Sequence, residues 1–243
     1  EPGHEIRKAH GANKPPHPMR VRCDFFTTGG QRVLDPFAGV GGTLLGAAIC
    51  DPPREAVGIE ISEEWIEVYH KVLESESGLI PGEMVRGDCR EILRQYPGES
   101  FDFVATDPPY NIHLERTMSD GSYPAFRNRH TDYAMYSDKN GDLANLGTYP
   151  EYLDAMEDVF RQCFRVLKTK RYMAFIVRNA YQDSEYIFTH VDLARRAKKV
   201  GFTPKGEIVW YQNGTRLRPY GYPYSYVPNI CHQFIVVLKK ERV

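Results

Sequence analysis

The residue types best suited to chemistry stand together in one short segment, Thr106-Asp107-Pro108-Pro109-Tyr110. An apolar run, residues 101–105, precedes it and predicts a buried strand. Two adjacent prolines remove two backbone donors, so the carbonyls beside Asp107 remain free acceptors. A carboxylate, a rigid carbonyl and an aromatic ring can accept two N–H bonds from a flat amino group and stack on its plane. The exocyclic amine of a nucleobase or a similar planar amide fits this segment; a strand-ending turn is the alternative.

A second segment, Asp35–Thr43, is rich in glycine and joins a predicted strand to a predicted helix. Gly39 and Gly41 let the backbone pass close to a ligand at a helix N-terminus. Glu60 lies 19 residues beyond Gly41, at a strand end from which an acid can bond ribose hydroxyls and would repel the 2′-phosphate of NADP. The dinucleotide pattern GxGxxG needs a glycine where this chain has Leu44. The segment therefore favours a nucleoside without phosphates, and a turn that only packs helix on strand is the alternative.

Asp88 follows the third predicted strand, and two roles are open to it. Its carboxylate could bond the amine of an adenine, or it could cap the short helix that follows.

The elements that must position these residues alternate along the chain. Hydrophobic periodicity predicts strands at 32–35, 56–60, 83–86, 101–106 and 172–177, and helices at 41–50, 63–75, 88–95, 150–168 and 185–200. This alternation predicts an α/β fold with a doubly wound, mostly parallel sheet that binds ligands at the carboxyl ends of its strands. Two final strands, 208–211 and 234–238, are joined without a helix and predict an antiparallel pair at the sheet edge.

The 243 residues are enough for one domain, which we place at 31–243. Residues 1–30 contain several prolines and predict an extended arm with a short helix near 19–27. The segment 111–149 interrupts the alternation of strands and helices. A lid over the substrate, or a target-recognition insertion, is favoured there over plain disorder.

Charge divides the chain into two parts. Residues 1–160 hold 15 Lys and Arg against 27 Asp and Glu, whereas residues 161–243 hold 16 against 5. The second part therefore suits a polyanion, although a solvated basic surface would give the same count. A loop at 213–226 adds arginine and tyrosine without an acid, and it predicts nucleic-acid contacts through Arg216, Arg218, Tyr220 and Tyr222. A basic run at 195–199 lies on a predicted helix and is interpreted as a solvated face.

Five dispersed cysteines form no CxxC pair, which indicates neither a zinc cluster nor a disulfide framework and favours a reducing cytoplasm. No apolar run of membrane-spanning length is present, and the sequence has no leader pattern.

The glycine segment and the Asp-Pro-Pro-Tyr segment together resemble the S-adenosylmethionine-dependent amino-methyltransferases of DNA, which methylate N6 of adenine or N4 of cytosine. The resemblance is strong over residues 31–110 and looser at two other places. Lys14–Pro18, within residues 1–30, resembles the family's segment that closes over the methionine end of the cofactor. At His232–Lys239, Gln233 stands at a position that is often Glu. It implies a Rossmann-like methyltransferase fold with S-adenosylmethionine as cofactor and no metal. The implied catalytic residues are Asp107, Pro108, Pro109 and Tyr110. The implied cofactor-binding residues are Asp35, Phe37, Gly39, Gly41, Glu60, Ile61, Asp88, Cys89, His17 and Pro18.

In this hypothesis Asp107 and the Pro108 carbonyl accept the two protons of the amine, while Tyr110 stacks on a base that has left the DNA helix. Adenine N6 is favoured over cytosine N4 because Asp is commoner before the two prolines in the adenine group. An RNA base methyltransferase, an inactive nucleic-acid-binding subunit of a modification complex and a protein-glutamine methyltransferase are the alternatives. The large target-recognition domain of the family is absent from this sequence, so a homodimer or an accessory specificity subunit is a further expectation.

Overall fold

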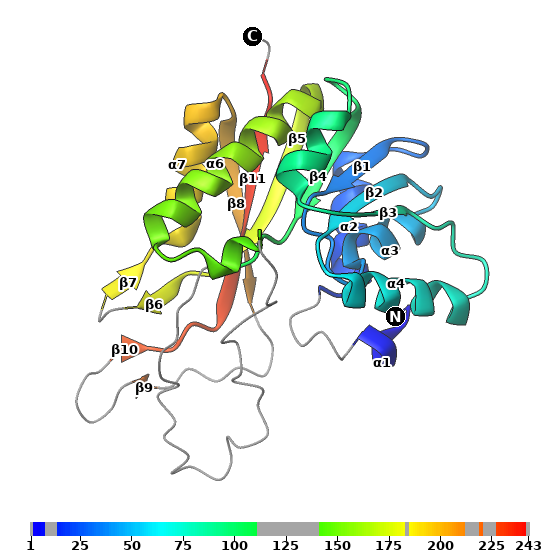
Figure 1. The fold of residues 1–243 in the computed structure, drawn as a ribbon, viewed down its shortest axis with the longest axis horizontal. Helices are drawn as coiled ribbons and strands as arrows, with labels where there is room; N and C mark the ends of the chain where they lie inside the picture. Colours follow the sequence, from blue (N-terminus) through cyan, green and yellow to red (C-terminus); the bar gives the residue numbers. More distant parts are fainter. Residues whose placement is uncertain are drawn as a thin grey trace.

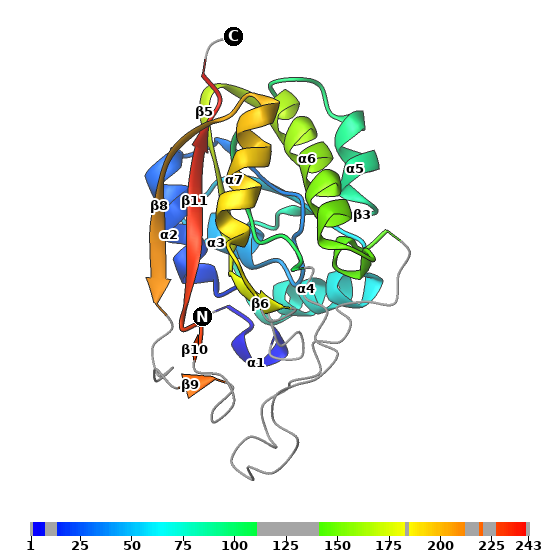
Figure 2. The same ribbon diagram turned by 90° about the vertical axis from the view of Figure 1, so that its left-hand side faces the viewer.

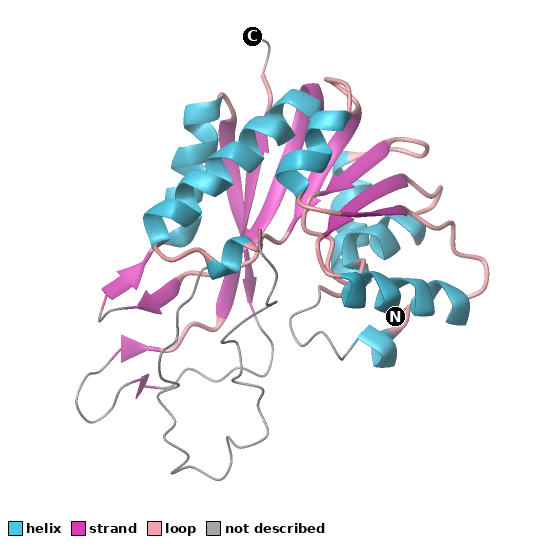
Figure 3. Ribbon diagram, in the orientation of Figure 1, coloured by secondary structure: helices cyan, strands magenta, loops and turns pink. Residues whose placement is uncertain are grey.

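The computed structural model describes residues 2–7, 14–110, 141–182, 185–211, 219–220 and 227–241. Its centre is a seven-stranded sheet with the strand order β3-β2-β1-β4-β5-β11-β8 (Figures 1 and 3). The strands are β1 (Arg32–Asp35), β2 (Glu55–Glu60), β3 (Glu83–Arg86), β4 (Phe101–Thr106), β5 (Leu167–Val177), β8 (Thr203–Tyr211) and β11 (His232–Lys239). Strands β1 to β5 pair in parallel, and β11 runs antiparallel to both β5 and β8. The predicted fold class is thereby confirmed.

Helices cover both faces of the sheet (Figures 1 and 2). One core contains α2 (Pro16–Phe26), α3 (Gly42–Ala48) and α4 (Glu63–Ser75); the other contains α5 (Cys89–Ile92), α6 (Tyr149–Val166) and α7 (Thr189–Val200). Because successive side chains of a strand point to opposite faces, Phe103 and Ala105 belong to the first core and Val104 to the second. A short helix, α1 (His4–Arg7), packs against α4.

Helix α6 shows how the sequence fixes an element and its packing. Thr148 and Glu151 form a reciprocal capping box at its start, which satisfies two backbone donors that the first turn would leave free. One stripe of the helix is apolar, and Phe160 on that stripe is fully buried with its ring centroid 5.5 Å from that of Phe175 on β5. Helix α6 therefore covers part of this face of the sheet, together with α5 and α7.

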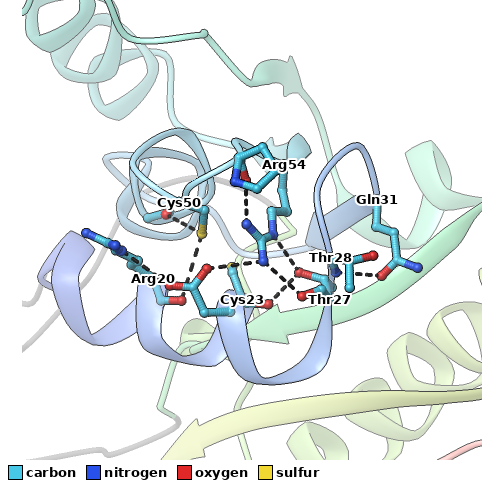
Figure 4. A network of polar contacts seen from close by, with 10 residues as sticks. Arg20, Cys23, Thr27, Thr28, Gln31, Cys50 and Arg54 are labelled. Atoms are coloured by element: carbon cyan, nitrogen blue, oxygen red, sulfur yellow. Dashed lines mark hydrogen bonds and ion pairs between the residues drawn. The ribbon is translucent and has the colours of Figure 1, made fainter.

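The short helix predicted near 19–27 is present as α2, which is three residues longer at its start than predicted. Helix α2 begins at Pro16, a favourable residue for a first turn, and buries Met19 and Cys23. Figure 4 shows how the end of α2 is tied to the loop before β2. The guanidinium of Arg54, 6% exposed, donates to the Thr27 side chain and carbonyl and pairs with Asp24 at 3.1 Å. Helix α2 is therefore part of the helical layer on one face of the sheet.

The helix predicted for 185–200 is wrong at its start. Residues Glu185–Ile187 form strand β7, which pairs antiparallel with β6 (Ala180–Gln182), and α7 begins only at Thr189. The side chain of Asn179 accepts bonds from the backbone and ring of His190 and donates to the Tyr186 hydroxyl. Aromatic and β-branched residues at 186 and 187 suit a strand, so the chain makes a hairpin before it turns into the helix.

The tail strands meet the expectation of an antiparallel pair at the edge, with β8 outermost. Most of β8 is exposed, including Ile208 at 50% and Val209 at 58%. Between these strands a small pair forms from β9 (Pro219–Tyr220) and β10 (Val227–Pro228). The predicted lid lies for the most part outside the described residues; its last part contains a 3-10 helix, Leu143–Asn145, and the start of α6. No helix in the described ranges is long and apolar enough to cross a membrane.

Candidate active site

The two predicted halves of the site meet at the carboxyl ends of adjacent strands. Strand β1 pairs in parallel with β4, with Leu34 opposite Val104. This register puts Asp35, the last residue of β1, level with Ala105, one residue before Thr106 at the end of β4, and Asp107 follows Thr106 directly. The Thr106 hydroxyl donates to the Asp35 carboxylate at 2.7 Å. This bond joins the glycine segment to the Asp-Pro-Pro-Tyr segment.

Asp35 is 3% exposed, and its carboxylate is held by three donors from the protein. Besides Thr106, the Phe37 backbone N–H donates to it at 3.0 Å and the Thr43 hydroxyl donates to its other oxygen. Burial raises the pKa of Asp35 to about 6, although these donors and the bond from Thr106 act to lower it. Asp35 thus holds the turn after β1, the start of α3 and the end of β4 in one arrangement.

The turn after β1 depends on glycine at two positions. Gly39 and Gly41 have φ angles of +52° and +80°, a region that other residues rarely adopt. A Cβ on Gly41 would also overlap the ring of Tyr69 from α4. Glycine at 41 is therefore required both by its φ angle and by the packing of Tyr69 against the turn, and Phe37 is half-buried against the core.

Glu60, at the end of β2, binds the same turn. Its carboxylate accepts from the Gly39 N–H at 2.9 Å and from the Ser62 N–H at 2.8 Å. Burial raises its pKa, against the effect of these backbone donors. Each oxygen accepts one of these bonds, and a carboxylate can accept about four in all, so Glu60 retains acceptor capacity toward a ligand. Ile61, the next residue, is half-buried.

Asp88 caps α5, one of its two predicted roles. Its side chain accepts from the Arg90 backbone N–H at 2.8 Å and forms an ion pair with the Arg90 guanidinium at 2.6 Å. Cys89 is 4% exposed in the core, and burial raises the pKa of its thiol well above the ordinary value. A contact of Cys89 with a ligand would therefore have to come from its backbone. The Gly141 carbonyl, from the segment before α6, also accepts from Arg90 at 3.4 Å.

Asp107 lies at the end of β4, and both oxygens of its carboxylate have donors. Tyr110 donates its hydroxyl to one oxygen at 2.7 Å, and Lys14 pairs with the other at 2.8 Å. The Asp107 side chain is 19% exposed. Burial raises its pKa, and Lys14 and Tyr110 act against that increase. Among the described residues, no backbone donor bonds the Pro108 carbonyl, as the two prolines lead us to expect.

Lys14, Gln233 and Trp210 complete this corner of the site, and the sequence analysis gave none of them a role at Asp107. The Lys14 ammonium donates to the Gln233 side-chain oxygen at 3.0 Å and lies 5.7 Å from the ring centroid of Trp210. More than 200 residues separate Lys14 from Gln233 along the chain. Only the position of β11 two places from β4 brings them together, which no local pattern indicates.

The remaining predicted residues are placed as follows. His17 and Pro18 lie in the first turn of α2, with His17 exposed. Arg216, Arg218 and Tyr222 lie outside the described residues, and Tyr220 is described only by its backbone in β9. In the basic run at 195–199, Arg196 and Lys199 pair with Glu157 of α6. These two therefore join α6 to α7, which fits a structural face better than a nucleic-acid contact.

Comparison with known proteins gives one family model and three curated relatives. The model of the DNA methylase family N6_N4_Mtase matches residues 101–243. The chain is 30% identical over 154 residues to tRNA (guanine(10)-N2)-dimethyltransferase of Pyrococcus abyssi, covering 63% of this chain and 44% of that protein. The same enzyme of Methanothermobacter thermautotrophicus is also 30% identical, over 152 residues. Type II methyltransferase M.BamHI of Bacillus amyloliquefaciens is 30% identical over 87 residues, 36% of this chain and 15% of that protein. The chain spans less than half the length of each relative.

Solved structures agree with the fold. TrmN from Thermus thermophilus superposes with a TM-score of 0.58 at 17% identity, covering 96% of this chain and 52% of that one. An S-adenosylmethionine-dependent methyltransferase from Methanosarcina mazei gives a TM-score of 0.54 at 14% identity, covering 91% of this chain and 98% of that one. The chain thus has a Rossmann-like methyltransferase fold.

Proposed function

We propose, from the premise that this chain belongs to the N6_N4_Mtase family of DNA methylases, that it methylates an exocyclic amino group of a nucleic-acid base. The chain is an S-adenosylmethionine-dependent methyltransferase. The proposal concerns its target, which we take to be N6 of adenine in DNA. The observation that carries it is the position of Asp107, followed in the chain by Pro108, directly after the strand that pairs with β1 and is bonded to Asp35 of the glycine turn.

The residues at this edge of the sheet fit the cofactor. The turn at Gly39 and Gly41 has the positive φ angles that glycine readily adopts, and Glu60 has acceptor capacity for hydroxyl groups. S-adenosylmethionine supplies a methyl group that its sulfonium already activates, so the protein has mainly to position the amine. In this proposal Gly39, Gly41, Glu60 and Ile61 would hold the cofactor, while Asp35 holds the turn in place.

Asp107 and Pro108 would act on the amine. Conjugation with the base makes an exocyclic nitrogen a weak nucleophile. Two acceptors that bond its two protons draw its lone pair out of the ring, and fixed acceptors in a partly buried site cost little reorganisation. Asp107 provides one acceptor and the Pro108 carbonyl the other. Tyr110 would leave its bond to Asp107 and stack on the base, which must be turned out of a duplex to reach the site.

A second target is favoured by the curated relatives. Two of them are named for the N2 amine of a guanine in tRNA, and they match about three fifths of this chain. Guanine N2 is also an exocyclic amine, so the same pair of acceptors would serve it. The family model and the relative M.BamHI favour DNA, and we place DNA adenine first.

Methyl-labelled cofactor incubated separately with duplex DNA, single-stranded DNA and tRNA, followed by nucleoside analysis, tests the target. We expect labelled N6-methyladenine from DNA. Label only in N2-methylguanosine from tRNA would replace the first target by the second, and label in none of the three pools would contradict the proposal.

Asp107→Asn tests the site because it keeps the shape and removes the charge. We expect methyl transfer to fall by at least about a hundredfold while cofactor affinity measured by calorimetry is retained. The matched control is Asp102→Asn, at the opposite end of the same strand, where the carboxylate pairs with Lys168 at 3.0 Å. A loss of cofactor affinity in Asp107→Asn as large as the loss of rate would contradict the assigned role.

A further inference from the structure

The backbone at Lys14 is fixed against the start of α3. The Lys14 carbonyl accepts from the guanidinium of Arg7 at 3.2 Å, and Arg7 is 1% exposed. The same carbonyl lies so close to Gly42 that a Cβ on Gly42 would overlap it. The Lys14 backbone therefore lies across the start of α3, and its side chain reaches Asp107.

The Lys14 side chain is as constrained as its backbone. Its ammonium bonds the Asp107 carboxylate at 2.8 Å and the Gln233 amide oxygen at 3.0 Å, with the side chain 13% exposed. The ring of Trp210 lies beside it, and the Arg22 guanidinium lies 5.3 Å from the centroid of that ring. Asp107, Gln233 and Trp210 are far apart in the sequence, and together they hold the Lys14 ammonium in place.

The charged and titratable groups around Asp107 in the described residues are few. Lys14 faces it from the segment before α2, Tyr110 from its own loop, and Asp35 from the neighbouring strand. Gln233, from β11, is neutral. Burial raises the pKa of Asp107 and Lys14 lowers it, whereas the negative charge of Asp35 disfavours ionisation. Lys14 is therefore the one cation among these groups.

We propose that Lys14, held in place by Gln233, is a positioning residue that keeps Asp107 ionised and its carboxylate fixed for the incoming amine. This inference rests on the proposed function, because it assumes that Asp107 accepts an N–H of the substrate. An ionised carboxylate can accept at both oxygens, whereas a protonated one would present a donor to a group that is itself a donor. Lys14 would thus determine the pH range in which the site can receive an amine.

The geometry also fits an opposite role. The Lys14 ammonium donates to Asp107 as the substrate amine would, so it could be a competitor that the substrate must displace. The two roles differ in sign. Loss of Lys14 slows the reaction, most strongly at low pH, if it is a positioning residue, and it accelerates the reaction if it is a competitor.

The experiment compares the pH–rate profiles of wild type, Lys14→Met, Lys14→Arg and Arg22→Met. Arg22→Met is the matched control because it removes the other cation on Trp210 without a contact to Asp107. An opposite charge within about 4–6 Å changes a carboxyl pKa by about 1–3 units. We therefore expect the acid limb of the pH–rate profile of Lys14→Met to lie about 1–3 pH units above that of wild type. Lys14→Arg should restore most of the wild-type profile, and Arg22→Met should keep it.

A second measurement does not need activity. Carbon-13 NMR of carboxyl-labelled aspartate, assigned with Asp107→Asn, follows the titration of Asp107 directly in wild type and in Lys14→Met. We expect its midpoint at higher pH in Lys14→Met. An unchanged midpoint, or a variant faster than wild type at every pH, would overturn the positioning role. If wild type methylates no nucleic acid, the proposed function fails, whereas the NMR titration still decides whether Lys14 controls the ionisation of Asp107.

Discussion

Asp35 offers a quantitative test because two opposing effects on its ionisation can be separated. Burial raises its pKa from 3.8 to about 6 despite three donors. A group whose pKa is higher in the folded than in the unfolded chain stabilises the fold below the unfolded value and loses that contribution as pH rises through the folded value. The difference of about 2 units, at about 1.4 kcal/mol per unit, corresponds to about 3 kcal/mol. Wild type should therefore lose about this much stability relative to Asp35→Asn as pH rises from about 4 to about 7.5.

The assay is the free energy of unfolding from urea denaturation at a series of pH values, for wild type and Asp35→Asn. Asp51→Asn, which removes an exposed carboxylate, is the reference for the loss of one negative charge. A difference between wild type and Asp35→Asn that stays constant with pH would refute the reasoning. A wild type that gains on the variant as pH rises would show that the three donors outweigh burial.

Two further predictions concern packing. Gly42→Ala places a methyl group against the Lys14 carbonyl. We expect this variant to have a lower Tm and to reproduce part of the Lys14→Met change in the pH–rate profile. A profile equal to that of wild type would show that the Lys14 backbone adjusts without moving the Lys14 side chain. Phe160→Ala leaves a cavity between α6 and β5. Urea denaturation should show that the free energy of unfolding falls by about 3–5 kcal/mol. A decrease below about 1 kcal/mol would mean that neighbouring side chains fill the space left at position 160.

Elements with strong local signals were predictable from the sequence. The predicted bounds of the strands at 32–35, 83–86 and 101–106 and of the helix at 63–75 coincide with those in the structure. In each, hydrophobic periodicity and the flanking residues indicate the same element. The hairpin at 180–187 was not predictable in this way, because its strands have only three residues each. Its start also depends on the Asn179 side chain, a contact that forms only in the folded chain.

The residues of the candidate site also differ in whether a local sequence pattern indicates them. Asp35, Glu60 and Asp107 were found because they end predicted strands, and parallel strands bring their carboxyl ends to one edge. Lys14 and Gln233 were not connected to Asp107, since their contact spans the whole chain and depends on the order of the strands. Thr43 and Thr106 were missed as donors to Asp35 because a threonine near a strand end is common and gives no separate signal. Sequence patterns thus indicate which residues carry charge, and the fold determines which of them meet.

The hydroxyl bond between Thr106 and Asp35 affects how variants of this protein should be interpreted. Thr106 is bonded to Asp35 through its side chain and to Asp107 through the peptide bond, so a displacement at the glycine turn reaches Asp107, the carboxylate that we propose binds the amine, within one residue. A substitution at Asp35 should consequently change both the turnover number and the apparent affinity for the methyl donor. From kinetics alone, Asp35 would then be taken for a catalytic residue, although its role is to hold the turn in place. Substitutions at Glu60, which accepts from Gly39 and Ser62 rather than from Thr106, should change the affinity with less effect on turnover.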